Sequence, residues 1–245
     1  MTRRHAHAGF TLVELAIAMF IIALLLGSIL VPLTMQVEQR QITDTQKTME
    51  EIRDALLGFA ATNGYLPCPD LQVGGTPNDG NEDVNVGSGF CTTTVPSPGG
   101  DLSAGNVPWA TLGLGNQDAW GNRFRYSVLA AYAQRAPAAL FSLGTAGGLR
   151  VCDNAACAPA ASVLTSTAVA VVISHGNNGR SAINALTNAA NIAATSADEV
   201  ENADNDRDAV SRTRSNVAAT EFDDIVIWLP KFTLNNRMVT AGKLP

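Results

Sequence analysis

Charge is scarce in this sequence, and basic charge most of all. Only 16% of its 245 residues are charged, and 22 acidic residues against 16 Lys and Arg leave a net charge of −6. Phosphate backbones are bound by basic surfaces, so this balance argues against nucleic acid as a main partner. Alanine, glycine, asparagine, serine and threonine are abundant instead, which suits an exported, loop-rich domain better than a cytosolic enzyme.

The sequence also lacks internal repeats and a recognisable catalytic set. Only three histidines occur. His175 stands in a turn-like stretch of glycine and asparagine, with no serine or cysteine nucleophile paired to it in the sequence. A histidine that hydrogen-bonds a turn is the expected role, and we expect no enzyme activity.

One long apolar run is the most informative feature that is present. Phe10–Met35 contains a single charged residue, Glu14, and follows the basic leader MTRRHAHAG. Leu15–Met35 would span roughly 31 Å as a helix, which matches the apolar thickness of a bilayer. Arg3 and Arg4 precede the run, so the positive-inside rule predicts that the leader stays in the cytoplasm and the rest is exported.

Two ordinary explanations fit this run less well. A secretory signal peptide has a shorter apolar core with a small-residue cleavage site behind it, whereas here the run continues past Gly27-Ser28 through Leu33. A plain signal anchor explains the length and the arginines. It does not explain Glu14, because a carboxylate inside hydrocarbon is costly and usually has a partner and a function.

The string Gly9-Phe10-Thr11-Leu12-Val13-Glu14-Leu15 resembles the processing site of type IV pilins and type II secretion pseudopilins. The resemblance implies cleavage between Gly9 and Phe10 by a prepilin peptidase, followed by methylation of the Phe10 amine. It also implies that Glu14 meets the N-terminal ammonium of a neighbouring subunit during assembly. The implied partners are other pilin or pseudopilin subunits, the peptidase and the assembly platform of the inner membrane.

A helical pattern continues beyond the apolar run to about Ala61. Apolar residues recur there with a spacing of three, four and seven, at Ile42, Met49, Ile52, Leu56 and Phe59, which gives one apolar face. Gly64 is the expected C-terminal stop, and Pro32 predicts a kink or a local loosening. The apolar face predicts packing on a globular domain, and the lower part of the helix then needs sibling helices once it leaves lipid.

The four cysteines all follow the apolar run, so the predicted topology exports them into an oxidising compartment. Pairing nearest neighbours in the sequence gives Cys68–Cys91 and Cys152–Cys157, although three pairings are possible. A zinc site is the alternative. The spacing fits zinc poorly, and no histidine is nearby.

The sequence of the exported part predicts a domain of loops, strands and a short helix. Residues 64–122 read mostly as loop, and Gly74–Gly100 as a surface excursion closed by Cys68–Cys91. Further on, Phe124, Tyr126 and Val128 alternate with Arg123, Arg125 and Ser127, which predicts a half-buried strand. Other strands are expected at Leu140–Leu143, Val169–Ser174 and Ile225–Leu229, and a short helix at Pro230–Gly242.

Two turns of this region are similar to those of major pseudopilins. Asp118-Ala119-Trp120-Gly121-Asn122 resembles their Asp-Pro-Trp-Gly-Asn turn, with Ala119 in place of proline. Ser174–Gly179 resembles their Ser-x-Gly-x-Asp/Asn-Gly pattern.

An acidic segment, Asp198–Asp208, follows these turns. Major pseudopilins bind calcium in a loop at this place, and closely spaced carboxylates are the ligands that calcium needs. The segment lacks the compact spacing of that family site, so a solvated acidic loop remains the alternative. The candidate ligands are Asp198, Glu201, Asp204, Asp206, Asp208 and, at the start of the last expected strand, Asp223; Asp224 could add another.

These observations predict an α+β protein in which a long N-terminal helix packs on an antiparallel sheet, as in pilins. The expected parts are a leader (1–9), a transmembrane and assembly helix (10–35), an amphipathic upper half of the helix (36–63) and a periplasmic head (64–245). The expected function is that of a pilus or pseudopilus subunit in a minor role, first held in the inner membrane and then part of a filament. The alternative is a signal-anchored periplasmic binding protein or hydrolase that uses a metal, the acidic loop and His175.

Overall fold

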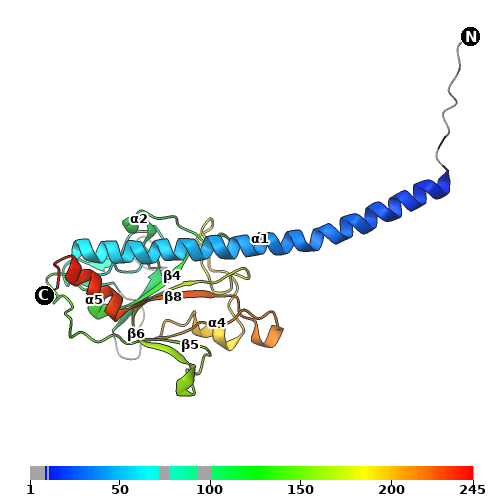
Figure 1. Ribbon diagram of the computed structural model, residues 1–245. Coiled ribbons are helices and arrows are strands. Elements are labelled where there is room, and N and C mark those ends of the chain that lie inside the picture. The colour runs from blue at the N-terminus through cyan, green and yellow to red at the C-terminus, as the bar shows by residue number, and fades with distance from the viewer. Residues whose placement is uncertain (1–8, 10, 72–77, 93–100, 245) are drawn as a thin grey trace, which may run out of the picture. The chain divides into compact units, whose positions relative to one another are not determined.

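The computed structural model describes residues 9, 11–71, 78–92 and 101–244, except for the side chains of 26–34. The chain divides into two compact units, one ending at Thr43 and one beginning at Asp44. Helix α1 (Leu12–Asn63) supplies the N-terminal unit and continues into the C-terminal one (Figure 1). The C-terminal unit also holds every strand that the structure describes, so the predicted α+β class is confirmed.

The N-terminal unit exposes apolar side chains. Large residues from Leu12 to Leu25 are between 51% and 85% exposed. Within the described part of the chain, none of the helices combines the length and the apolar character that a bilayer crossing requires. Of the expected membrane segment 10–35, Phe10 and the side chains of 26–34 lie outside the described residues.

The part of α1 in the C-terminal unit buries the predicted apolar face. Met49, Ile52 and Leu56 are at most 1% exposed and belong to the hydrophobic core. The helix ends at Asn63, and the Gly64 amide donates to the Ala60 carbonyl at 2.8 Å. Gly64 has a φ of +93°, which glycine adopts without strain, so it stops the helix as the sequence predicts.

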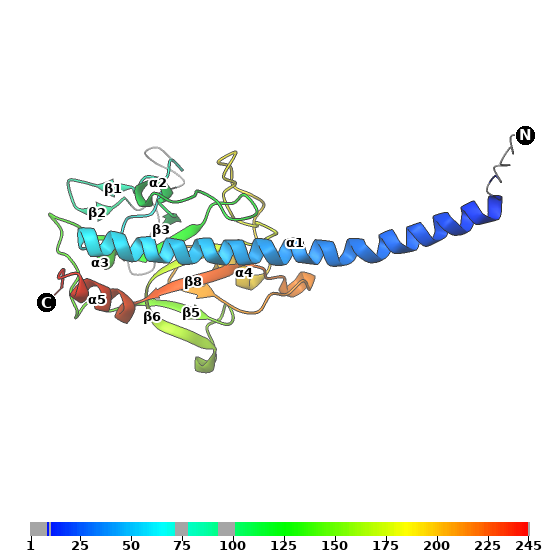
Figure 2. The same ribbon diagram turned by 45° about the horizontal axis from the view of Figure 1, so that its top comes forward.

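A six-stranded sheet packs against this part of α1 (Figure 2). Its strand order is β3-β4-β6-β5-β7, and β8 also pairs with β6. The strands are β3 (Leu102–Asn106), β4 (Arg125–Leu129), β5 (Leu149–Cys152), β6 (Val163–Ser174), β7 (Asp208–Val210) and β8 (Ile225–Pro230). All pairs are antiparallel except β5 with β7, so the expected antiparallel sheet is mixed at that edge.

Strand β6 is the centre of the sheet, because β4, β5 and β8 all pair with it. Its residues 168–174 are all buried, which explains why the apolar run Val169–Ser174 predicts this strand correctly. The strand itself begins at Val163, six residues before the predicted start at Val169. Its residues 163–167 are exposed or half-buried, so no apolar run marks them in the sequence. The prediction at Ile225–Leu229 is also confirmed, and β8 extends one residue further to Pro230.

Two strand predictions need correction. Strand β4 is buried on both faces, because Arg125 and Ser127 are covered as well as Tyr126 and Val128. The Arg125 guanidinium lies beneath residues 201–208, where it donates to Asn205.

The second correction concerns Leu140–Leu143, which forms no strand. Phe141 alone enters the core, with its ring 4.8 Å from that of Tyr132, while Leu140 and Leu143 stay exposed. The Ser142 amide bonds to the Thr145 hydroxyl and forms a turn instead. This short apolar run therefore places one side chain in the core and pairs with no strand among the described residues.

Shorter elements surround the sheet. They are the α-helices α2 (Trp109–Leu112), α3 (Ala130–Ala133) and α4 (Ala197–Glu201), the short 3-10 helices η1 (Ala160–Ser162) and η2 (Ala218–Thr220), and the ribbon of β1 (Val84–Asn85) with β2 (Phe90–Cys91). The predicted C-terminal helix is α5 (Lys231–Thr240), which buries Leu234 and Met238. Of the excursion Gly74–Gly100, residues 74–77 and 93–100 lie outside the described residues.

Strand β3 was not predicted, and Gly105 shows what it requires. A Cβ at Gly105 would lie 2.4 Å from the Asp70 carbonyl oxygen, so only glycine allows this approach. Asp70 and Asn106 exchange two backbone hydrogen bonds there. The contact fixes Asp70, whose side chain is fully buried, beside the β3 edge.

Asp70 is expected to make stability depend on pH. Burial, with a smaller contribution from the Asp79 and Asp83 carboxylates, raises the pKa of Asp70 to about 7, against the opposing effects of the Gly80 amide and Arg123. An acid whose pKa is higher in the folded state contributes stability below its unfolded pKa of about 4, and this contribution is lost as the pH rises through about 7.

We therefore expect Asp70→Asn to raise the free energy of unfolding at pH 8 by about 1 kcal/mol and to flatten its decline between pH 4 and 8. Urea unfolding of the full chain in detergent measures this, with exposed Asp54→Asn on α1 as the control. An unchanged pH slope in Asp70→Asn would contradict the assignment.

Candidate functional site

The first candidate site is the junction at the start of α1. Gly9 is exposed, and open space surrounds the position that a Cβ would occupy; Phe10 lies outside the described residues. Glu14 Oε2 accepts hydrogen bonds from the Thr11 amide at 2.9 Å and from the Thr11 hydroxyl at 2.8 Å. The Glu14 amide donates in return to Thr11 Oγ1 at 3.3 Å.

This reciprocal pattern is a capping box, in which Thr11 is the N-cap and Glu14 the third helical residue. It satisfies two amides that a helix start otherwise leaves without partners, and it places a carboxylate at the positive end of the helix dipole. The Thr-x-x-Glu spacing is readable in the sequence, but the sequence analysis assigned Glu14 to assembly alone. The structure therefore adds a local role for Glu14.

The second candidate site is the acidic part of the C-terminal unit. The structure does not bring the six predicted calcium ligands together there. Glu201, Asp204 and Asp206 bring one carboxylate oxygen each within 4.8 Å of one another. Asp208 forms an ion pair with Arg150. Asp198 pairs with Arg212 at 2.6 Å and accepts from the Ala155 amide. Asp223 belongs to a different cluster.

The group of Glu201, Asp204 and Asp206 is half-exposed and has cationic neighbours. Burial, followed by the neighbouring Asp206, Asp204 and Asp208, raises the pKa of Glu201 to about 7, which the Arg150 guanidinium opposes. Arg125 lies below this segment, and burial lowers its pKa to about 10, so it stays charged at neutral pH. Arg125 and Arg150 therefore already supply positive charge to this turn.

The second cluster is buried and consists of Glu199, Asp223 and Asp224, whose ligand oxygens also lie within 4.8 Å of one another. Each carboxylate accepts a hydrogen bond: the Asn178 side chain donates to Glu199 Oε1, the Asn178 amide to Asp223 Oδ2 and the Asn202 side chain to Asp224 Oδ2. Glu199 Oε2 and Asp223 Oδ1 are buried without a hydrogen bond.

Buried carboxylates this close raise one another's proton affinity. Burial, followed by the Asp224 carboxylate, raises the pKa of Asp223 to about 6, while the Asn178 amide and Arg214 lower it. Burial also raises the pKa of Glu199. Two buried oxygens without donors and three acids in contact are the arrangement that a bound cation would satisfy.

His175 lies against this buried cluster. It is 1% exposed, and its Nδ1 is 3.5 Å from Asp224 Oδ1. The backbone forms the expected turn, since the Gly179 amide donates to the His175 carbonyl. Gly176 is required there, because its φ is +58° and a Cβ would lie 2.3 Å from the Asp223 carbonyl oxygen.

Sequence reasoning placed Asp223 of this cluster in the predicted ligand set and named Asp224 as a possible addition, but it did not select Glu199 as a ligand. The signal that could have found the cluster is the combination of the turn after Ser174 with the Asp223-Asp224 pair before β8. Strand pairing between Ser174 and Ile225 brings these two segments together. Glu199 reaches them from α4, whose N-cap Ser196 accepts from the Glu199 amide.

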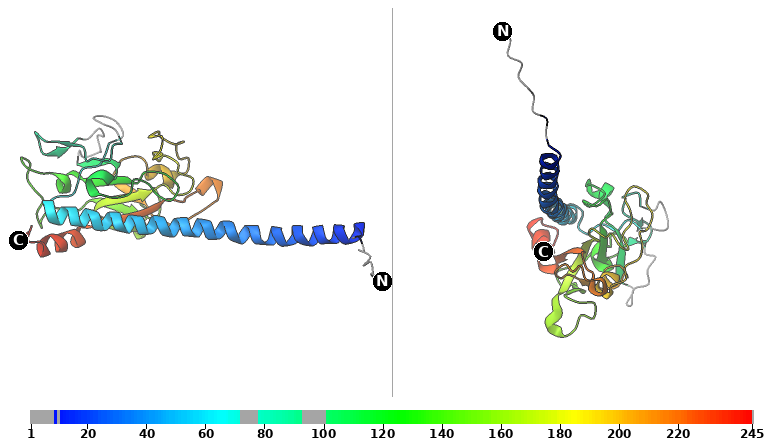
Figure 3. Two further views of the ribbon diagram at one scale, coloured as in Figure 1. Left: turned by 90° about the horizontal axis from the view of Figure 1, so that it is seen from above. Right: turned by 90° about the vertical axis from the view of Figure 1, so that its right-hand side faces the viewer.

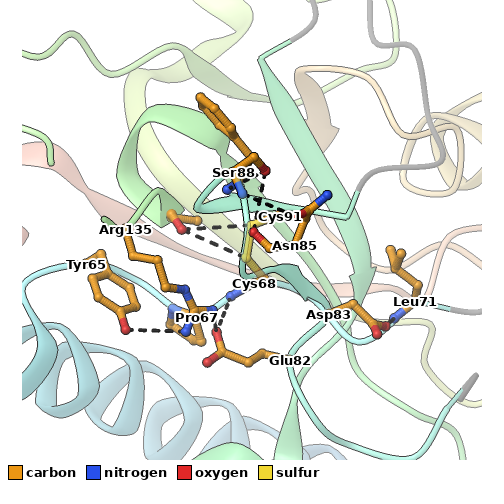
Figure 4. Close-up of a disulfide and its surroundings, with 12 residues drawn as sticks. Tyr65, Pro67, Cys68, Leu71, Glu82, Asp83, Asn85, Ser88, Cys91 and Arg135 are labelled. Carbon is orange, nitrogen blue, oxygen red and sulfur yellow. Dashed lines mark hydrogen bonds and ion pairs between the residues drawn. A yellow bond between two sulfur atoms is a disulfide. The ribbon is translucent and has the colours of Figure 1, made fainter. Parts of the chain in front are cut away.

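Both expected disulfides are present. Cys68 and Cys91 are joined with their Cα atoms 5.3 Å apart, and Cys152 and Cys157 with theirs 5.2 Å apart. Around the first bridge, Glu82 accepts from the Cys68 amide at 3.1 Å and pairs with Arg135 at 2.7 Å (Figure 4). Arg135 also lies over the Tyr65 ring, so the bridge and the ion pair lie together around the segment that follows α1, which the bridge links to strand β2.

Comparison with known proteins identifies the N-terminal site. Residues 4–30 match the family model of the prokaryotic N-terminal methylation motif, the signature of type IV pilins and pseudopilins. Comparisons with curated proteins and with solved structures found no match.

The two bridges are expected to differ in their contribution to stability. A longer closed loop restricts the unfolded chain more, so replacing Cys68 and Cys91 together by serine should cost about 2–4 kcal/mol of unfolding free energy. The same double replacement at Cys152 and Cys157, only 5 residues apart, should cost less. Urea unfolding measures both, and peptide mapping without reductant should recover the two pairs. Free thiols or an exchanged pairing would contradict it.

Proposed function

We propose that this protein, which carries the methylation motif of type IV pilins and pseudopilins at residues 4–30, is a structural subunit of a type IV pilus or a type II secretion pseudopilus, in a minor role. In this proposal a prepilin peptidase cleaves between Gly9 and Phe10, and the mature subunit enters a filament through α1. The motif carries the proposal, and the geometry of the two units supports it.

Access to the cleavage site is compatible with processing. Gly9 is exposed, nothing among the described residues approaches its Cβ position, and α1 begins three residues later. A larger side chain would therefore fit at position 9 without disturbing the fold. If a Gly9 variant is not cleaved, the peptidase and not the fold must require the glycine.

The two units have different burial requirements. The C-terminal unit covers the apolar face of its part of α1 with the sheet. The N-terminal unit leaves apolar side chains such as Leu12, Phe20 and Leu24 at least 60% exposed. Such a surface needs a lipid or protein environment, and in the proposed filament sibling helices provide it.

The enzyme alternative has less support. His175, its proposed metal-binding or catalytic histidine, is 1% exposed, so a substrate from solvent does not reach it in this conformation. Its side chain faces Asp224 in a cluster of acids. This arrangement suits a structural cation better than a reacting group.

A calcium ion fits the buried cluster of Glu199, Asp223 and Asp224. The donors are all carboxylates, the class that calcium prefers, and two of their oxygens lack hydrogen bonds. Bound there, a cation would neutralise the mutual repulsion of the acids and link α4 to the start of β8. Of the six ligands predicted from the sequence, Asp223 belongs to this cluster, and Glu201, Asp204 and Asp206 form the competing group.

Substitutions at Glu14 test the assembly role and separate it from helix capping. Glu14→Gln keeps an oxygen for the Thr11 amide but removes the charge, because glutamine also serves in a capping box. Glu14→Ala removes both. If the charge pairs with a neighbour's ammonium, both variants should be cleaved normally and should fall about tenfold or more in the sheared-filament fraction.

Gly9→Leu is the contrasting control, since it should stay uncleaved as well as unassembled. Mass spectrometry of the N-terminus reports cleavage and methylation, and quantitative blotting of membrane and filament fractions reports assembly. Wild-type levels of Glu14→Gln in filaments would reduce Glu14 to a capping residue. Unprocessed wild-type protein in a host with a working prepilin peptidase would overturn the proposed function.

Calcium should raise the thermal stability of the full chain in detergent. At a calcium concentration of one hundred times Kd the gain is about 2.7 kcal/mol. Asp223→Asn should abolish the calcium-dependent shift, whereas Glu201→Gln, in the half-exposed group, should retain it. Scanning calorimetry with calcium and with a chelator measures the shift. Identical unfolding in both conditions, or a shift lost only in Glu201→Gln, would contradict the assignment.

A further inference from the structure

The small loop closed by Cys152 and Cys157 contacts helix α4. Cys152 is the last residue of β5 and is fully buried, so one end of the loop is fixed in the sheet. Cys157, at the other end, has a φ of +46°, in the left-handed region that residues other than glycine avoid, and the bridge holds it there. Between the two cysteines, the Ala155 amide donates to Asp198 Oδ1 of α4 at 2.9 Å.

Asp198 makes a second contact with its other carboxylate oxygen. Asp198 Oδ2 lies 2.6 Å from Arg212 Nε, and both side chains are mostly buried. The Arg212 guanidinium also donates to the Thr220 carbonyl at 2.9 Å, and its Cζ lies 4.7 Å from the centre of the Phe222 ring. Helix α4 and the segment 211–223 therefore lie side by side in the C-terminal unit (Figure 3).

Each of these two segments presents part of the buried acidic cluster. Glu199 follows Asp198 directly in α4, and Asp223 and Asp224 follow Phe222, which is fully buried. Asp198 therefore ties the segment that carries Glu199 to the segment that carries the other two acids. Groups that hold metal ligands in place typically change metal affinity by about 10- to 100-fold when they are removed.

Asp198 is not itself a member of the cluster, although the sequence analysis named it as a candidate ligand. Both of its oxygens are engaged elsewhere, Oδ1 by the Ala155 amide and Oδ2 by Arg212. The carboxylate oxygens of the buried cluster that lie within 4.8 Å of one another are those of Glu199, Asp223 and Asp224.

We propose that Asp198, held by the loop that the Cys152–Cys157 bridge closes, is a positioning residue for the cation site, so that calcium affinity depends on this bridge. The inference rests on the calcium site of the proposed function. Without either support, α4 can move relative to the segment 211–223, and the ligands must be ordered when the cation binds. The bridge closes a short loop and so adds little to stability, but its loss lowers calcium affinity.

Calorimetric titration of the full chain with calcium, in detergent, tests the positioning role. Asp198→Ala should weaken binding about tenfold, because it removes both contacts. Asp198→Asn keeps an oxygen for the Ala155 amide and should fall between this variant and wild type. Calcium affinity of the folded chain is the informative quantity, since a residue that only stabilises the fold would shift unfolding in chelator and leave this affinity unchanged.

Glu82→Ala is the matched control for Asp198→Ala. Glu82 also accepts from a backbone amide at a disulfide, that of Cys68, and also pairs with an arginine, Arg135, with similar burial. The control removes the same charge from a place outside the acidic cluster, and it should bind calcium like wild type. Equal weakening by the two variants would reduce the effect to net charge and overturn the inference.

The bridge allows a second test that changes no charge. Replacing Cys152 and Cys157 together by serine should weaken calcium binding about tenfold with a small loss of stability. The same replacement at Cys68 and Cys91 should cost more stability and leave calcium affinity unchanged. Adding Asp198→Ala to the Cys152 and Cys157 variant should weaken binding little further, because both changes remove one support. Additive losses, about 100-fold in all, would overturn the inference.

The outcomes for wild type and variants separate this inference from the proposed function. A wild-type chain that binds no calcium would overturn the calcium site and this inference with it. Calcium binding that is lost in Asp223→Asn but unchanged in Asp198→Ala and in the variant without the Cys152–Cys157 bridge would overturn the positioning role alone. Cleavage after Gly9 and assembly into filaments test the pilin assignment independently of both.

Discussion

Burial of one face of α1 is the contact on which the head depends. Met49, Ile52 and Leu56 reach the same core as β4, β6 and β8, so the helix serves as one wall of the domain. Without it, the apolar residues of central strand β6 would face water. The same covalent helix continues into the N-terminal unit. In the proposed filament, a head that folds around its own segment of α1 is therefore attached to the polymer by an element it cannot release without unfolding.

The buried polar groups of the head differ in whether they find hydrogen-bond partners. Arg123 is 4% exposed, yet its guanidinium finds carbonyl oxygens of Asn78, Asn116 and Ala185 and an aromatic ring. Glu199 and Asp223 are the contrary case, because each keeps a buried oxygen without a donor. Buried polar groups are normally satisfied, so this difference makes the acidic cluster, and not the arginine, the place to look for a missing ligand.

Much of the fold could be predicted where the signal is local. The apolar spacing of Met49, Ile52 and Leu56 and the glycine at 64 define the end of α1, and the apolar runs of β6 and β8 mark central strands. Strand β3 escaped prediction because Leu-Ser-Ala-Gly-Asn has no strand-like pattern and depends on its neighbours β4 and Asp70. The run Leu140–Leu143 led to a wrong strand prediction for the opposite reason. Its pattern is apolar, but it pairs with no strand in the described part of the chain.

The candidate sites differ in the same way, because one depends on local sequence and the other on contacts between distant segments. Gly9, Phe10 and Glu14 are adjacent in the sequence, so their pattern is complete without a structure. The buried cluster is not, because Glu199, Asp223 and Asp224 come from segments that meet only through the pairing of β6 with β8. The sequence identified the acidic segment, but it could not show which of its carboxylates joins the buried cluster, which form the half-exposed group and which pair with Arg150 and Arg212.

Capping and assembly need not compete for Glu14. Both hydrogen bonds that its carboxylate receives from Thr11 fall on the same oxygen, Oε2. A carboxylate has about four lone-pair sites on two oxygens, so Oε1 can accept from an ammonium while Oε2 still caps the helix. The box would then hold the carboxylate in place before a neighbour arrives, which reduces the entropy lost on pairing. Helix capping would thus prepare the charge for assembly, and one residue would serve both roles at once.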